Sequence, residues 1–85
     1  MALTPAERER FDLTSAVLLA VERRAELLDL VAESPSADEA RQRIREVFSV
    51  SEAAATHVMA LEVRRFARDA VERVRAEHAA LLREQ

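Results

Sequence analysis

Two histidines are the side chains best suited to proton transfer or metal binding near neutral pH. His57 lies among alanine, threonine, valine and methionine, and its nearest carboxylates, Glu52 and Glu62, are five residues away on either side. Helical side chains meet at spacings of three or four, so neither carboxylate would share its face. The chain has no cysteine, and two histidines are too few for a zinc site without carboxylate help. We therefore interpret His57 and His78 as packing or interface residues, and we expect no metal and no cofactor.

Carboxylates are plentiful, but none is paired in a way that suits general acid–base catalysis. Asp38 and Glu39 have a simpler explanation, because acidic residues in the first turn of a helix complement its dipole. A general base also needs a positioned substrate and an environment that shifts its pKa. The sequence shows neither, so we expect a protein without enzymatic activity.

The densest basic cluster is formed by Arg64, Arg65 and Arg68, which are the candidates for a phosphate contact. Proteins dedicated to nucleic acids usually carry a strongly basic surface, often with aromatic residues for stacking. This chain has a formal net charge of −3, and its aromatic residues are three phenylalanines. We do not expect nucleic-acid binding by the chain on its own, and a small nucleic-acid-associated regulator is the alternative hypothesis for its function.

The composition predicts an all-α fold, because glycine is absent and good helix formers dominate. Thr4-Pro-Ala-Glu7 and Ser36-Ala-Asp-Glu39 are capping boxes, Pro35 interrupts the chain between them, and Ser51 is a further cap. We expect a single domain over residues 1–85. Its helices are expected at about 5–33, 37–48, 52–66 and 69–83.

The apolar pattern predicts how these helices pack. Residues 5–33 carry apolar side chains at spacings of three and four, which is typical of one long amphipathic helix. Residues 69–83 carry a narrower stripe and would return antiparallel to it. Asp69-Ala-Val-Glu72 is a third capping box, so the sequence leaves open whether the last two helices are continuous through 66–70. The predicted architecture is a coiled-coil-like antiparallel helical hairpin with a small helical head, built from three or four helices.

The size of the chain indicates self-association. A domain of 85 residues buries only about 60–65 % of its unfolded surface, which leaves a monomer marginally stable. A two-fold dimer is the commonest way to cover exposed apolar surface. No apolar run approaches the roughly 18 residues of a membrane span, and Met1-Ala-Leu-Thr4 lacks the basic and apolar regions of a signal peptide. We therefore expect a cytoplasmic homodimer that does not contact membranes.

Several motifs occur in an order that is found in a known family. They are Glu33-Ser-Pro-Ser-Ala-Asp-Glu-Ala-Arg41, Phe48-x-Val-Ser-Glu-x-Ala-Ala55, then Met59, Leu61 and Val63-Arg-Arg-Phe66, and finally Arg75-Ala-Glu-His78. Together they resemble the coiled-coil and exit-gate region of the A subunit of bacterial DNA gyrase and topoisomerase IV. The resemblance runs without gaps from about Leu18 to Leu82.

The resemblance implies a subunit contact without DNA-cleavage chemistry. In that family this region is a helical pair whose head joins two subunits. The DNA-cleaving tyrosine has no counterpart, because the chain contains no tyrosine. The sequence also departs from the family pattern: Ala54 replaces glutamine, Ala67-Arg-Asp-Ala70 replaces Thr-Gly-Leu-Glu, and His78 stands where tyrosine is usual. The usual glycine break is therefore lost.

The first hypothesis for function is a non-catalytic interaction and dimerisation module. It would pair with a second copy, or pair with or modulate a type IIA topoisomerase through that enzyme's A subunit. The contact is expected in the stretch 50–66, which combines a helix start with a dense apolar face. The predicted interface residues are Val50, Ala54, His57, Val58, Met59, Leu61 and Phe66.

Overall fold

Side-chain caps determine where three of the helices begin. The structure is a computed structural model that describes residues 2–84. The Thr4 hydroxyl accepts a hydrogen bond from the Glu7 amide, and the Glu7 carboxylate accepts one from the Thr4 amide. The hydroxyls of Ser36 and Ser51 likewise accept from the amides three residues further on. Each hydroxyl or carboxylate satisfies an amide that has no partner inside a helix, so these starts are the ones the sequence predicts.

The chain forms five α-helices and one 3-10 turn within residues 2–84. No strand occurs in this range, so the predicted all-α class is confirmed. The helix expected at 37–48 coincides with α3, whereas the other three expected ranges differ from the structure. The elements are α1 (Pro5–Glu22), α2 (Arg24–Ala32), α3 (Ala37–Phe48), α4 (Glu52–Met59), η1 (Val63–Phe66) and α5 (Arg68–Arg83).

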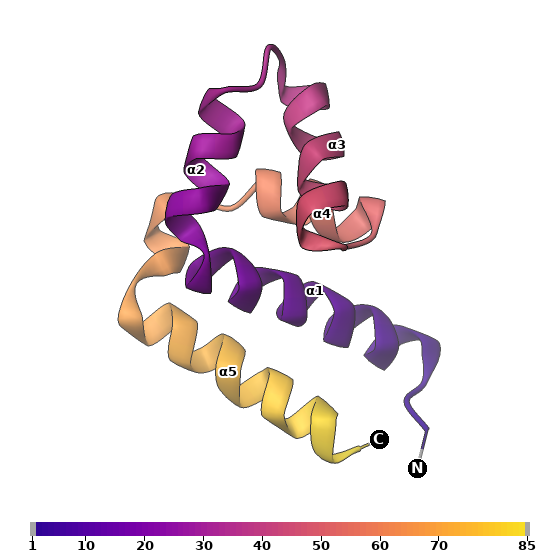
Figure 1. Cartoon of the computed structure of the whole chain (residues 1–85). Helices are drawn as coiled ribbons and strands as arrows, with labels where there is room; N and C mark the ends of the chain where they lie inside the picture. Colours follow the sequence, from indigo (N-terminus) through magenta and orange to yellow (C-terminus); the bar gives the residue numbers. More distant parts are fainter. Residues whose placement is uncertain (1, 85) are drawn as a thin grey trace.

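The single helix expected at 5–33 is wrong, because it is broken at Arg23, where φ is −112° and ψ is 36°. Neither glycine nor proline causes this break. The Arg23 guanidinium lies 4.4 Å from the centre of the Phe48 ring, and its Nε and a terminal nitrogen donate to the Glu26 carboxylate at 2.8 and 2.7 Å. These contacts hold α2 at an angle to α1 (Figure 1) and let Leu27 reach the core. The bend is therefore supported by tertiary contacts.

A second correction concerns residues 60–68. The helix expected at 52–66 ends at Met59, and a single 3-10 turn, η1, follows after a short extended segment. The capping box expected at Asp69 is also absent, because α5 starts one residue earlier with Ala67 as its uncapped N-terminal residue. The Asp69 carboxylate instead accepts from the Ala70 amide at 2.8 Å and pairs with Arg73. The last two helices are thus not continuous.

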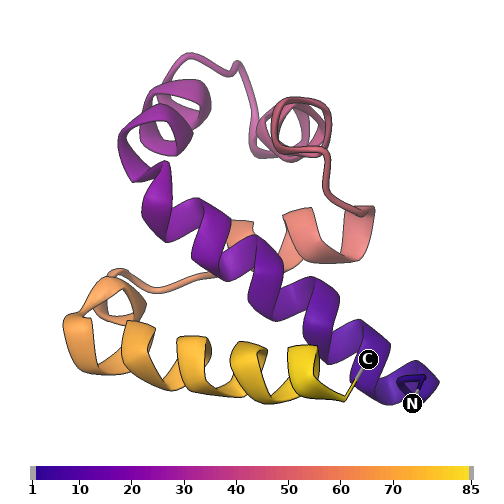
Figure 2. The ribbon, with the colours of Figure 1, turned by 60° about the horizontal axis from the view of Figure 1, so that its bottom comes forward.

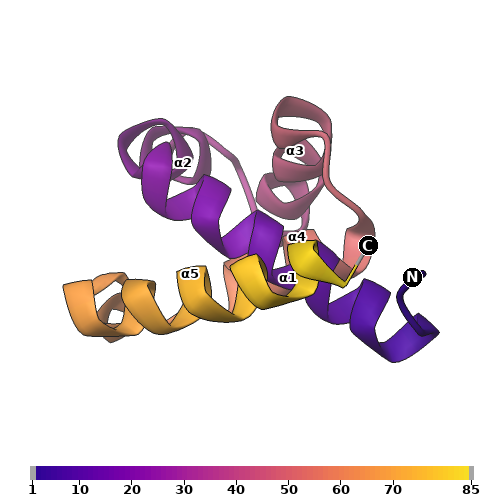
Figure 3. The same cartoon turned by 90° about the horizontal axis from the view of Figure 1, so that it is seen from below.

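The helices form two packed groups that share α1. On one side α5 runs antiparallel to α1, and an ion pair between Arg10 and Glu77 joins them (Figure 2). On the other side α4 packs against α1 and α3, and α2 and α3 stand away from α5 (Figure 3). Because α2 packs against α3 and only α1 pairs with α5, the predicted coiled-coil-like hairpin with a helical head is not confirmed. The Cα atoms span 43 × 26 × 16 Å, which makes the molecule flat and elongated.

The core between α1, α2, α3 and α4 is small, and four of the eight residues in its buried cluster are alanines. Ile44 is the largest side chain that is fully buried among residues 2–84. Little apolar volume is therefore available to stabilise the fold. The buried cluster consists of Ala16, Ala20, Leu27, Ile44, Phe48, Ala54, Ala55 and Val58.

Ser49 ends α3 in a left-handed conformation, with φ 54° and ψ 49°. A side chain costs roughly 1–2 kcal/mol in this region, and glycine avoids most of that cost. We expect Ser49→Gly to raise the free energy of unfolding by about 0.5–1 kcal/mol, reduced from the full cost because glycine also loosens the unfolded chain. Urea denaturation followed by circular dichroism measures it. A destabilised Ser49→Gly protein would contradict this geometry, and Ser36→Gly, at an extended cap, is the control that should not gain stability.

The solvent-accessible Arg23–Glu26 pair predicts a small acid-dependent contribution to stability. Hydrogen bonding by the Arg23 guanidinium holds the pKa of the Glu26 carboxyl below its ordinary value of 4.5. A lowered folded-state pKa stabilises the fold above the unfolded pKa, and that stability is lost as the pH falls through the folded pKa. We expect Glu26→Gln to lose less stability than the unmodified chain between neutral pH and about pH 3, as measured by urea midpoints. The control is Glu33→Gln, whose carboxylate has no ion pair within residues 2–84; an equal acid response of both variants would contradict the prediction.

Candidate functional site

The structure divides the seven predicted interface residues by exposure. Ala54 and Val58 are 1 % and 6 % exposed and belong to the core. They can touch a second subunit only if that core opens. His57 is exposed on α4, and the remaining four are partly exposed. Those four are Val50, Met59, Leu61 and Phe66.

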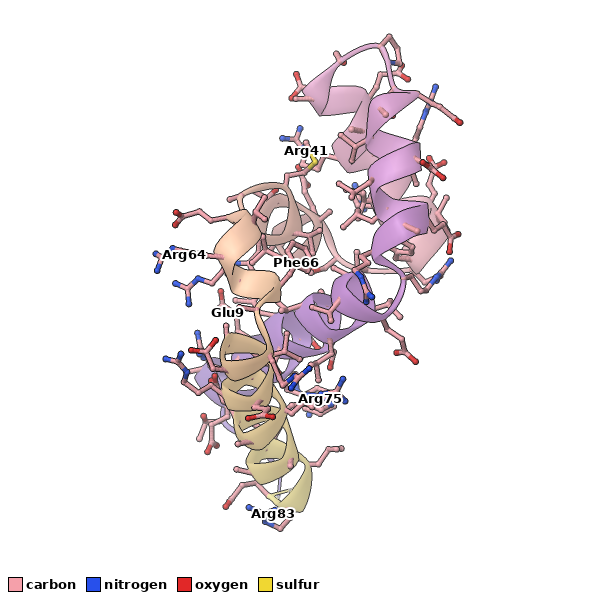
Figure 4. All side chains as sticks on the ribbon, turned by 90° about the vertical axis from the view of Figure 1, so that its left-hand side faces the viewer. Glu9, Arg41, Arg64, Phe66, Arg75 and Arg83 are labelled. Carbon is pink, nitrogen blue, oxygen red and sulfur yellow. The ribbon has the colours of Figure 1, made fainter. Side chains whose placement is uncertain are left out.

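Val63 is the residue that the sequence reasoning left out of the interface. It is 86 % exposed at the start of η1, more than any other large apolar side chain among residues 2–84. We call Val63 and its three partly exposed apolar neighbours in the chain, Met59, Leu61 and Phe66, the η1 surface; Met59 and Leu61 also pack against the buried core. The sequence alone does not indicate this exposure, because a continuous helix over 52–66 would place Val63 on a different face. In the structure α4 ends at Met59, and Val63 begins η1 after a short extended segment. Figure 4 shows Arg64 pointing away from the molecule and Phe66 lying toward its interior.

The three arginines of the basic cluster differ in their partners. The Arg64 guanidinium donates twice to the Glu62 carboxylate at 3.2 Å, and both side chains are well exposed. Within residues 2–84, neither Arg65 nor Arg68 forms an ion pair. All three residues are exposed, and they lie at the end of η1 and the start of α5.

A cavity of about 370 Å³ lies between α1, the α4–η1 connection and α5. Its apolar lining includes Leu13, Val17, Leu61 and Val74. Its charged lining comes from α1, the α4–η1 connection, η1 and α5. The charged residues and the histidine are Arg10, His57, Glu62, Arg65, Arg73 and Glu77.

Neighbouring carboxylates orient two of the cavity's arginines. The Nε of Arg10 donates to Glu77 at 2.8 Å across the α1–α5 contact, and Arg73 donates to Asp69 at 3.0 Å one turn earlier on α5. Arg65 is the cavity arginine that has no such carboxylate among the described residues. The charge that a ligand could engage is therefore concentrated at Arg65.

His78 lies in the contact between α1 and α5, which agrees with its interpretation as a packing residue. Its ring stacks on Phe11 with centres 4.7 Å apart, and its Nδ1 lies 3.1 Å from the Thr14 hydroxyl. That hydroxyl can also donate to the Phe11 carbonyl at 3.1 Å. Because a hydroxyl has one proton, the two bonds coexist only when His78 Nδ1 carries a proton and donates to Thr14. Because Thr14 is only 5 % exposed, this hydrogen bond satisfies a buried hydroxyl in the contact between α1 and α5.

No three histidine or carboxylate side chains within residues 2–84 are grouped so that they could hold a metal ion. None of the helices in that range has the length and apolar character needed to cross a membrane. No protein-family model matches the chain, and no curated protein is similar to it. The resemblance to the gyrase A subunit thus stays a prediction from the motifs.

Proposed function

We propose that the chain is a non-catalytic interaction module that forms a two-fold dimer through the η1 surface. The observation that carries the proposal is the 86 % exposure of Val63 beside the partly exposed Met59, Leu61 and Phe66. Exposed apolar surface marks interaction sites in soluble proteins when the side chains adjoin one another.

The charges beside the η1 surface favour a second copy as the occupant. In a two-fold contact the same patch faces itself, so residue i of one subunit meets residue j of the other and the reverse holds too. The patch is bordered by a carboxylate, Glu62, and an arginine, Arg64, which form an ion pair with each other within one chain and are both well exposed. Across a two-fold axis the carboxylate of one subunit could face the arginine of the other, and the reverse contact would form as well. A dimer would also stabilise a fold whose own core is small.

The test compares two aspartate substitutions at exposed apolar residues. Val63→Asp should keep the fold and raise the dissociation constant of the dimer at least tenfold, about what burying one unpaired charge costs. Leu82→Asp is the matched control, because Leu82 is 50 % exposed and lies on the order of 20 Å along α5 from η1. Sedimentation equilibrium gives both constants. Equal dimerisation of the two variants would contradict a contact at the η1 surface.

The motif resemblance extends the proposal to a second partner, the A subunit of gyrase or topoisomerase IV. The exposed stretch 59–66 overlaps the motif Val63-Arg-Arg-Phe66 on which that resemblance partly rests. We expect a purified bacterial gyrase A subunit to be retained by immobilised chain at micromolar concentration, and to be lost with Val63→Asp. Absence of retention by the unmodified chain removes this partner but leaves the homodimer proposal standing.

A nucleic-acid-associated regulator remains the second candidate, because Arg65 and Arg68 form no ion pair within residues 2–84. Phosphate contacts of this kind weaken as salt is added, since they release counterions. Gel retardation on duplex and single-stranded DNA at low salt discriminates the two candidates. Retardation that is abolished by changing Arg64, Arg65 and Arg68 to glutamine supports the second candidate, and no retardation at low salt ends it.

A further inference from the structure

The cavity between α1, the α4–η1 connection and α5 has the size and lining of a small-molecule site. Ligand pockets in proteins usually measure roughly 300–1,000 Å³ and combine apolar walls with a few converging polar groups. This cavity measures about 370 Å³. At about 30 Å³ per water-sized group it has room for roughly twelve such groups. A ligand of about ten to twelve non-hydrogen atoms would therefore fill it.

The walls select a ligand with an apolar body. Leu13 and Val17 of α1, Leu61 before η1 and Val74 of α5 all line the cavity, and Ala60 and Ala70 leave space between them. Burying a short hydrocarbon chain against these side chains is favourable at about 25 cal/mol per Å² of apolar surface, whereas a small inorganic ion gains nothing from them. The cavity thus suits an organic molecule better than free phosphate.

The charges select an acidic head group. The lining contains three arginines, Arg10, Arg65 and Arg73, against two carboxylates, Glu62 and Glu77. Glu77 is paired with Arg10 and Glu62 with Arg64, which is outside the lining. Arg65 keeps a planar guanidinium without an ion pair in the part of the chain that the structure describes. A guanidinium in this state matches the two oxygens of a carboxylate.

We infer that this cavity binds a small amphipathic carboxylate, with its carboxylate on Arg65 and its apolar chain against Leu13, Val17, Leu61 and Val74. Nucleic acid is a poorer occupant, because its phosphates would leave the apolar walls uncovered. Arg68, the other arginine of the cluster without an ion pair, does not line the cavity. Comparing variants of Arg65 and Arg68 therefore distinguishes a ligand site in the cavity from a general basic surface.

The test uses octanoate, a saturated carboxylate of ten non-hydrogen atoms, titrated calorimetrically into the purified chain. We expect saturable binding that Arg65→Met weakens about tenfold, since a charge-assisted hydrogen-bond pair is lost. Arg68→Met, the matched control, should change the affinity less than about twofold because Arg68 lies outside the cavity. Both residues are exposed, so both variants should fold, which circular dichroism verifies. No saturable binding, or an equal loss in both variants, overturns the inference.

Two further ligands and one mapping experiment test the parts of the inference separately. Octan-1-ol keeps the chain without the charge, and inorganic phosphate keeps a charge without the chain; both should bind at least about tenfold more weakly than octanoate. Either ligand binding as tightly as octanoate contradicts the combined site. Amide chemical shifts in NMR should change at Leu61 and Ala70 on adding octanoate and stay constant in α3. Changes confined to α3 would place the ligand elsewhere and overturn the site.

Discussion

Replacing Ile44 by alanine is expected to lower the free energy of unfolding by about 3 kcal/mol, within the range of 2–5 kcal/mol for buried isoleucine. Ile44 lies on α3 with 0 % of its surface exposed and belongs to the buried core cluster. Truncation removes apolar contacts and leaves a cavity that the surrounding structure refills only in part. A chain of this size is stable by only roughly 4–13 kcal/mol, so one methyl-rich side chain carries a large share of it.

The matched control is Val47→Ala, one turn of α3 away, where the side chain is 46 % exposed. We expect this change to cost less than about 1 kcal/mol, since little apolar surface is lost from the interior. Urea unfolding monitored by circular dichroism gives both values. Equal costs for the two substitutions would mean that α3 does not bury Ile44 in the way the structure describes.

Val58→Asp should have the second large effect, destabilising the fold by at least about 3 kcal/mol, because it places an unpaired charge in the interior. Val58 is 6 % exposed and contributes to the buried cluster between α1, α3 and α4. The sequence reasoning placed Val58 at a dimer contact, where the same change would separate subunits that remain folded. Thermal unfolding by circular dichroism, combined with the solution mass, distinguishes these two results.

Val63→Asp is the control for this substitution, because the same charge is introduced at a residue that is 86 % exposed. When both proteins are diluted until they are monomeric, its free energy of unfolding should stay within about 0.5 kcal/mol of that of the unmodified chain. A folded and monomeric Val58→Asp protein would contradict the core position of Val58 and return it to the interface.

Local chemistry made the helix starts predictable from the sequence. Thr4, Ser36 and Ser51 each accept from an amide three residues later, which is an interaction between neighbours in the chain. The left-handed turn at Ser49 follows from the same need to satisfy the end of α3, although serine in place of glycine gave no clear signal. The three caps depend on few residues that are close in the sequence, so the sequence pattern predicts them.

Long-range contacts explain what the sequence did not predict. The break at Arg23 is supported by a contact with Phe48, which is twenty-five residues away in the sequence. The helix propensities of the residues around Arg23 favour an unbroken helix. The end of α4 at Met59 likewise has no proline or glycine behind it. The Arg23 break is supported by packing against a distant segment, and at both places hydrophobic periodicity alone predicted longer helices.

The candidate site could be predicted only in part, because it too depends on contacts between distant segments. The stretch 50–66 does hold the η1 surface and one wall of the cavity. Three of its residues lie differently from the prediction: Ala54 and Val58 of α4 are buried in the core, although a helix was predicted there, and Val63 is exposed to solvent. The cavity itself was beyond prediction, because Arg10, Arg65 and Arg73 are brought together by the antiparallel packing of α1 and α5 and by the turn at η1.

The solution mass of the unmodified chain tests dimerisation through the η1 surface most directly. Multi-angle light scattering at about 100 µM should give twice the 9.6 kDa of a single chain, and the mass should fall toward that of the monomer on dilution. The Val63→Asp protein should give the monomer mass at the same concentration. A strictly monomeric unmodified chain, or a dimer that Val63→Asp leaves intact, would contradict the account.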